Sequence, residues 1–282
     1  MLRRCGPVVP ARPGIETVAP SICSLLGIPA PLHSTSAVPG RLAWPVGVGG
    51  PARGLVFCPD AVGDHLADSA GTAMALVRRS APLELALRAC VPPVTPVCFA
   101  SMFTGAPPGI HGIVRYEKPV LSCDTVFDCA VRAGLGAGIV AVRGSSIDLI
   151  FRGRPIDYFS MPDDRAVRRR AIELIEAREH ELLVVYQQDY DDLLHERGPF
   201  DAAALEAVRR HSEDFAALVG AAEAHWAGPP WFASFAPDHG AHVLPGGRGD
   251  HGEDIPEDMA VTHFWRLSPP GSSGGRFAPT GS

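Results

Sequence analysis

The pattern that most constrains the fold is a series of short apolar runs separated by segments of helical character. Four runs have the length and composition of buried strands, at residues 54–58, 139–142, 182–186 and 231–236. Helices are expected over residues 18–28, 83–90, 124–133, 162–179 and 201–225, the fourth with Ser160 as its cap. Strands that alternate with helices form a mainly parallel sheet with helices on both faces. The predicted fold class is therefore α/β.

The regular pattern begins near residue 51 and ends near residue 267. Residues 1–50 are rich in proline and glycine and hold one apolar helical stretch, which we expect to pack on the core. Residues 51–267 are long enough to form one large domain with its own core. The tail, residues 268–282, contains a Ser-Pro-Pro-Gly-Ser-Ser-Gly-Gly run and is predicted to be disordered.

The charge balance limits the partners of the chain. Its formal net charge is −6 and its pI is about 6.0, whereas proteins that bind nucleic acid or anionic membranes normally carry a basic surface. The one dense basic run, residues 168–170, lies in a helical pattern with Glu173 and Glu176, so we interpret it as a solvated helix face. We therefore expect neither a nucleic-acid partner nor a membrane partner.

The lack of a recognisable targeting signal and the pattern of cysteines favour a cytoplasmic protein. No stretch approaches the roughly 20 apolar residues of a membrane span, and prolines interrupt the region where a signal peptide would need an apolar run. The seven cysteines are odd in number and include no Cys-x-x-Cys pair, so neither a disulfide framework nor a zinc ribbon is indicated. We expect reduced thiols and a cytoplasmic location.

Acidic residues and histidines follow three of the predicted strands. They are Asp60 after the first strand, Asp191 and His195 after the third, and Asp238 and His239 after the fourth, with His251 close behind. Taken alone, each is consistent with a turn, a helix cap or an exposed helix face. In open parallel sheets, however, ligands gather beyond the carboxyl ends of the strands. Together the residues predict a shared metal site, because carboxylate and imidazole groups suit a zinc-type cation.

A second motif lies between the first two predicted strands. It contains Thr95, then Thr104-Gly105, then a Pro-x-x-His-Gly-Ile segment that includes His111. In this order and spacing it resembles the alkaline phosphatase superfamily, specifically the type I phosphodiesterase/nucleotide pyrophosphatase branch. The resemblance extends from about Leu55 to Trp265 and is to the short bacterial members. It implies a three-layer alkaline-phosphatase-like core with a mainly parallel sheet flanked by helices.

The resemblance also implies two divalent metal ions of the zinc type, with manganese as the alternative. One ion would be held by Asp60, Thr95, Asp238 and His239, and the other by Asp191, His195 and His251. Asp189 and Asp192 compete with Asp191, which alone keeps the Asp-x-x-x-His spacing of the family. His242 and His263 are the alternatives to His251, whose His-Gly context is that of the short bacterial members.

The activity that the resemblance implies is metal-dependent hydrolysis of a small-molecule phosphate ester, of the phosphodiesterase/nucleotide pyrophosphatase type, with Thr95 as the nucleophile. A threonine hydroxyl is a poor nucleophile near neutral pH, and a bound cation lowers its pKa. The alternatives are a phosphomonoesterase with the same site and a metal-binding relative without activity.

The chain departs from the family pattern at Cys98. Classical nucleotide pyrophosphatases have an Asn three residues after the nucleophile, and a thiol is a weaker donor than an amide. This difference leaves the choice between diester and monoester open. Arg115 and Lys118 are candidates for compensating positive charge. Cys98 lacks the Cys-x-Pro-x-Arg pattern of sulfatases, which argues against that activity.

Overall fold

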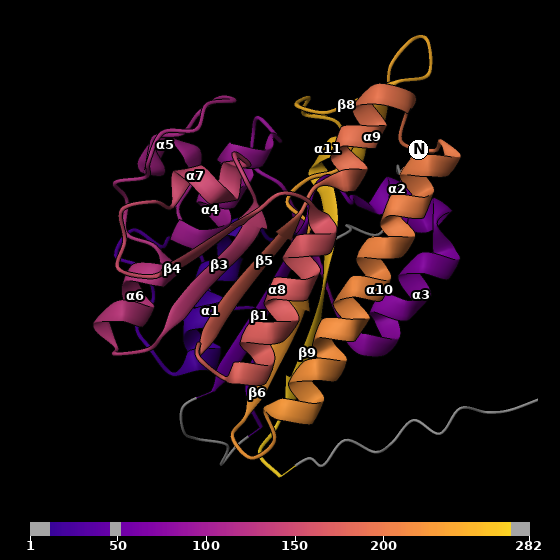
Figure 1. The fold of residues 1–282 in the computed structure, drawn as a ribbon. Helices are drawn as coiled ribbons and strands as arrows, with labels where there is room; N and C mark the ends of the chain where they lie inside the picture. Colours follow the sequence, from indigo (N-terminus) through magenta and orange to yellow (C-terminus); the bar gives the residue numbers. More distant parts are fainter. Residues whose placement is uncertain (1–11, 46–51, 272–282) are drawn as a thin grey trace, which may run out of the picture.

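The structure is a computed structural model that describes residues 12–45 and 52–271 (Figure 1). The strands of its main sheet are β1 (Arg53–Pro59), β2 (Leu83–Arg88), β3 (Ala137–Val142), β4 (Asp157–Met161), β5 (Leu182–Gln187), β6 (Trp231–Phe235) and β9 (Ala260–Ser268). In the described residues they form one seven-stranded sheet of order β2-β9-β6-β1-β5-β3-β4. Neighbours from β6 to β4 are parallel, and β9 is antiparallel to both of its neighbours. A separate ribbon pairs β7 (His242–Val243) with β8 (Gly249–Asp250).

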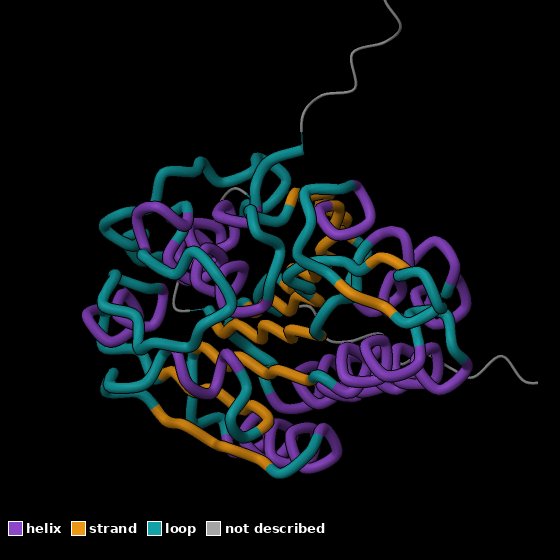
Figure 2. The backbone as a smooth tube through the Cα atoms, turned by 90° about the horizontal axis from the view of Figure 1, so that it is seen from above, coloured by secondary structure: helices purple, strands orange, loops and turns teal. Residues whose placement is uncertain are grey.

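Helices cover both faces of this sheet, as the view in Figure 2 shows. One face packs against α1 (Val18–Leu26), α4 (Thr95–Thr104), α6 (Val126–Arg132) and α7 (Ser146–Ile150). The other packs against α3 (Gly71–Ser80), α8 (Asp164–Ala177), α9 (Asp189–Arg197) and α10 (Ala202–His225). The remaining helices are η1 (Ile15–Thr17), α2 (Asp64–Ser69), α5 (Pro108–His111) and α11 (Pro256–Met259).

Strand β1 shows why the sheet needs a layer of helices on each side. Its side chains alternate between the two faces, as in any strand. Leu55 and Phe57 lie in the core under α3, α8 and α10, whereas Val56 and Cys58 lie in the core under α1, α4 and α6, and all four are fully buried. A strand that is apolar on both faces is stable only between two helical layers. The three-layer α/β architecture expected from the sequence is confirmed.

Two local expectations are wrong. Residues 83–90 were expected to be a helix, but Leu83–Arg88 form the edge strand β2, paired with β9. Its leucines fall at every second position, which is the period of a strand, although leucine, alanine and glutamate also favour helices. Ser160 does not cap the next helix, because it lies within β4. The helix begins at Asp164, and the side chain of Asp163 accepts the capping hydrogen bond from the Ala166 N–H.

The N-terminal helix α1 lies within the fold. Its residues from Val18 to Leu26 are almost all buried, and it contacts α4, α6 and β1. The division into residues 1–50, 51–267 and 268–282 stays a prediction, because residues 46–51 and 272–282, including most of the expected disordered tail, lie outside the described residues. No helix among the described residues is long and apolar enough to cross a lipid bilayer.

Candidate metal centre

The candidate site lies beyond the carboxyl ends of adjacent parallel strands. Asp60 follows β1, α9 follows β5, and Asp238 and His239 follow β6. Because β6, β1 and β5 are neighbours in the sheet, their ends lie side by side. The backbone N–H of Ala61 donates to Asp238 Oδ1 at 3.2 Å, which ties the end of β1 to the segment after β6.

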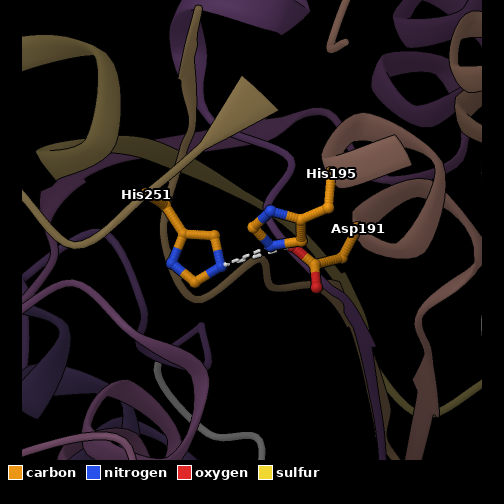
Figure 3. A group of neighbouring side chains, drawn as sticks. All are labelled: Asp191, His195 and His251. Carbon is orange, nitrogen blue, oxygen red and sulfur yellow. Dashed lines mark hydrogen bonds and ion pairs between the residues drawn. The ribbon is translucent and has the colours of Figure 1, made fainter. Parts of the chain in front are cut away.

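The first group consists of Asp191, His195 and His251, whose side chains point toward one another in Figure 3. Asp191 and His195 are one turn apart on α9, and His251 follows β8. The Nε2 atoms of the two histidines are 3.2 Å apart, and each is 3.4 Å from Asp191 Oδ1. The three potential ligand atoms therefore form a nearly equilateral triangle.

Backbone carbonyls set the orientation of both rings in this group. His195 Nδ1 lies 3.3 Å from the carbonyl oxygen of Gly249, and His251 Nδ1 lies 3.2 Å from that of Pro93. A carbonyl can only accept, so each Nδ1 carries the hydrogen and donates it. In the neutral rings both Nε2 atoms are then acceptors that face a carboxylate oxygen. Only a proton or a cation can satisfy three such atoms.

The second group consists of Asp60, Asp238 and His239, all buried. His239 Nδ1 donates to the Gly240 carbonyl at 3.0 Å, which leaves Nε2 as an acceptor. Nε2 is 3.3 Å from Asp238 Oδ2 and 3.6 Å from Asp60 Oδ1. Asp238 Oδ2 is a buried atom with no hydrogen-bond partner in the described residues, which is costly unless a cation binds there. The His239 and His251 rings are in contact, with centroids 4.1 Å apart and planes tilted by 33°, and so join the two groups.

Thr95 completes the second group. It is the first residue of α4 and is 3% exposed. Its Oγ1 lies 3.4 Å from Asp60 Oδ2 and 3.4 Å from His239 Nε2. Thr95 also lines a cavity of about 260 Å³ together with Asp60 and Asp191. The hydroxyl is therefore next to the second candidate ligand group and also faces the cavity.

Burial and mutual repulsion shift the pKa values in both groups. Burial, together with the neighbouring carboxylates, raises the pKa of Asp60 and of Asp238 well above the usual range. Burial also lowers the pKa of His239. Burial would raise the pKa of Asp191 too, but the His195 and His251 rings, which donate to this carboxylate once they are protonated, outweigh it and lower the value. The same carboxylate raises the pKa of His195 to about 9.

The alternative ligands named from the sequence lie outside both groups. Asp192 accepts from the Gln188 side chain at 3.1 Å, and Asp189 accepts from Arg210 at 3.2 Å. His242 Nδ1 is 2.9 Å from Asp258 Oδ1, and His263 Nε2 donates to the Pro237 carbonyl at 2.7 Å. The structure thus brings together the seven residues preferred from the sequence and none of the four alternatives.

Other residues of the motif serve the fold around Thr95. The Ile113 N–H donates to His111 Nδ1 at 3.2 Å, so His111 Nε2 carries the hydrogen and donates to Ser101 Oγ at 2.9 Å. This bond joins the turn after α5 to α4. The Cys98 thiol contacts Cys90, with the sulfurs 3.5 Å apart, and Arg115 pairs with Glu117 on the surface.

The sequence did not predict the position of three residues that line the cavity. Tyr186 is the buried end of β5, and its hydroxyl donates to Asp60 Oδ2. A tyrosine at the end of an apolar run gives no signal of this role. Arg143 follows β3, so the same strand-end rule that found Asp60 could have found it. The sequence marked Lys118 as a candidate for compensating positive charge but not where it would lie. In the structure it lines the cavity, as Arg143 does.

Comparisons with known proteins support the fold. No family model and no curated protein matches the sequence. The structure is similar to a phosphonoacetate hydrolase from Sinorhizobium meliloti 1021 in complex with phosphonoformate, with a TM-score of 0.54 and 16% identity over 71% of this chain and 61% of that one. It is also similar to an inactive variant of murine ectonucleotide pyrophosphatase/phosphodiesterase 5 in complex with AMP (TM-score 0.56, 16% identity, 69% and 58% coverage).

A further similar structure is the C-terminal periplasmic domain of EcEptC from Escherichia coli in complex with zinc, with a TM-score of 0.53 and 12% identity over 80% of this chain and 75% of that domain. The chain spans about six-tenths of the length of the first two proteins. At these identities the likeness shows the fold, which is alkaline-phosphatase-like as expected.

Gly240 provides a test of how tightly the Asp238-His239 turn is held. A Cβ at Gly240 would lie 2.0 Å from the Glu257 carbonyl oxygen, a backbone atom that cannot move alone. We expect Gly240→Ala to lower the free energy of unfolding by about 1–3 kcal/mol or more, as in other overpacked sites. Gly220→Ala is the control, because its Cβ would meet nothing within 4 Å on α10. It should stabilise the protein by about 0.5–1 kcal/mol. Chemical denaturation of both variants measures the change in the free energy of unfolding. Equal changes in the two variants would contradict the close packing described at Gly240.

Proposed function

We propose that this protein is a two-metal hydrolase of phosphate esters that uses Thr95 as its nucleophile. The observation that carries the proposal is the pair of ligand groups at the carboxyl edge of the sheet, one of which includes the Thr95 hydroxyl. When the histidine rings are neutral, acceptor atoms face acceptor atoms in both groups, so each group needs a proton or a cation. The likeness of the fold to a hydrolase and a pyrophosphatase/phosphodiesterase adds support.

Divalent zinc fits the donor atoms and their spacing. Bonds of roughly 2.0–2.1 Å in a tetrahedral zinc site separate the ligand atoms by about 3.3 Å. The distances within the first group, and those from His239 and Thr95 to their neighbours in the second, are 3.2–3.6 Å. Asp191, His195 and His251 would hold one ion, and Asp60, Thr95, Asp238 and His239 the other. Manganese is the alternative, since mixed carboxylate and imidazole groups also accept it. Bound ions would lower the pKa of the Thr95 hydroxyl and offset charge on the phosphoryl oxygens.

The reaction itself follows from the position of Thr95. Its Oγ1 attacks phosphorus, which forms a phosphothreonine and breaks the bond from phosphorus to the leaving oxygen. The hydroxyl proton leaves toward Asp60 or solvent, and the leaving oxygen takes up a proton. Water then hydrolyses the phosphothreonine and restores the hydroxyl. Tyr186 donates to Asp60 and so fixes the orientation of that carboxylate.

Two alternatives to a phosphodiesterase or pyrophosphatase share this site. A phosphomonoesterase would use the same residues, whereas a relative without activity would bind metal but not turn over. The buried, aligned hydroxyl of Thr95 favours an enzyme, because a purely structural metal site has no need of it. A cytoplasmic location, expected from the cysteine content, stays a prediction.

The first test of the proposal is metal content. We expect about two transition-metal ions per chain in protein purified without chelator. Asp191→Ala and His251→Ala should each lose about one ion, because each removes one of the few ligands of that ion. The matched controls Asp192→Ala and His242→Ala should keep both. Elemental analysis of the five proteins decides this. A protein that contains no zinc, manganese or iron, even after reconstitution, would contradict the proposal. Loss of metal in Asp192→Ala and His242→Ala, but not in Asp191→Ala and His251→Ala, would reject the ligand assignment.

The second test concerns Thr95. Thr95→Ala should keep most of its metal, because six other ligands remain, yet lose a factor of about 10³ or more in turnover. Thr95→Ser should retain part of the activity. Thr104→Ser is the control on the same helix, since the Thr104 hydroxyl bonds only within α4 and to the Ala106 N–H. Mass spectrometry of acid-quenched protein should find phosphate on Thr95. Turnover by Thr95→Ala near the parental rate would instead show attack by water.

A further inference from the structure

Two cationic side chains line the cavity next to Thr95. Lys118 comes from the loop after α5, and Arg143 follows β3. Lys118 Nζ donates to the Gly144 carbonyl oxygen at 3.0 Å and lies 5.6 Å from the centre of the Tyr116 ring. This bond holds the Lys118 ammonium against the residue that follows Arg143. The two positive charges are therefore on the same wall of the cavity.

Neither cation has a carboxylate partner among residues 12–45 and 52–271. Lys118 contacts a carbonyl and a ring, and Arg143 Nη2 has only the Ser160 carbonyl at 3.5 Å. Nearby arginines are paired, such as Arg152 with Asp148 and Arg154 with Asp128. Like charges that share a wall repel each other, so this wall favours an anion.

The carboxylates of the same cavity do not supply that anion. Asp60 and Asp191 belong to the two candidate metal groups, where bound cations would take up their charge. Asp192 accepts from the Gln188 side chain and forms no ion pair with Lys118 or Arg143 in the described residues. Under the proposed function, the positive charge of Lys118 and Arg143 thus remains for a ligand.

The size and lining of the cavity limit what that ligand is. At about 260 Å³ it is smaller than the roughly 300–1,000 Å³ typical of sites for drug-sized ligands. Its walls contain charged residues, serines, a glutamine, a glycine and a threonine, with the rings of Tyr116 and Tyr186 but no aliphatic side chain. Such walls have little apolar surface with which to bind a nucleobase or an acyl chain.

Building on the proposed function, we propose that the substrate is a small phosphate ester whose leaving group carries a second anionic group, bound by Lys118 and Arg143. Thr95 attacks the phosphoryl group at one end of the cavity, and the two cations hold the other end of the substrate through charge-assisted hydrogen bonds. The leaving group departs with its own anionic group unchanged.

The test compares two esters of similar size on the zinc-loaded protein. Phosphoglycolate carries a carboxylate on its leaving group, and ethyl phosphate does not. We expect kcat/KM for phosphoglycolate to exceed that for ethyl phosphate by about 10- to 100-fold, the scale of hydrogen bonds to a charged group. In Lys118→Gln and Arg143→Gln this ratio should fall toward one. Arg115→Gln is the control, because Arg115 pairs with Glu117 outside the cavity, and it should keep the parental ratio.

The outcomes separate this inference from the function on which it rests. A parental ratio near one would overturn the inference but leave the phosphoesterase intact. Equal losses on both esters in Lys118→Gln and Arg143→Gln would also overturn it, because the cations would then bind the phosphoryl group under attack. If neither ester is hydrolysed, a phosphomonoesterase is excluded but a phosphodiesterase or pyrophosphatase is not, and calorimetric binding of the two esters decides the inference. Tighter binding of phosphoglycolate that Lys118→Gln abolishes would support it, and equal binding would contradict it.

Discussion

The crowding of acceptor atoms at the carboxyl edge of the sheet, which only a proton or a cation can balance, is the constraint around which this structure is organised. The Nε2 atoms of His195 and His251 and the Oδ1 atom of Asp191 lie within 3.4 Å of one another, and in neutral rings none carries a hydrogen. A similar arrangement of Asp238 and His239 is buried beside Thr95. Crowding such groups without a proton or a cation is costly, above all for Asp238 and His239, which are fully buried. This cost is the physical basis for proposing metal ions here.

The surrounding fold keeps these atoms in place by backbone contacts. Carbonyl oxygens of Pro93, Gly240 and Gly249 fix the rings of the three histidines through Nδ1. Outer contacts of this kind orient metal ligands and set which nitrogen faces the ion. The parallel order of β6, β1 and β5 brings their carboxyl ends together, and helical layers bury these strands on both faces. The site therefore lies at the end of strands that are held in the core.

Most of the fold class and the candidate ligands could be predicted because both depend on local patterns. Apolar runs buried on both faces identify parallel strands, and the residues that follow them share one edge of the sheet. The edge strand β2 was misassigned because its Leu-Glu-Leu-Ala-Leu-Arg sequence suits a helix by propensity, and its pairing with β9 is a contact distant in sequence. The placement of Lys118 beside Arg143 also depends on a contact between segments distant in sequence, the hydrogen bond from Lys118 to the Gly144 carbonyl. Tyr186 looked like any other residue of a buried strand.

The central claim is that two metal ions bind in the two groups described. A crystal structure of the zinc-loaded protein, with anomalous scattering recorded on both sides of the zinc absorption edge, tests it most directly. The account predicts two anomalous peaks per chain. One lies among Asp191, His195 and His251, and the other among Asp60, Asp238, His239 and the Thr95 hydroxyl. The claim would be contradicted if zinc bound only elsewhere, or if neither group showed an anomalous peak in protein saturated with zinc.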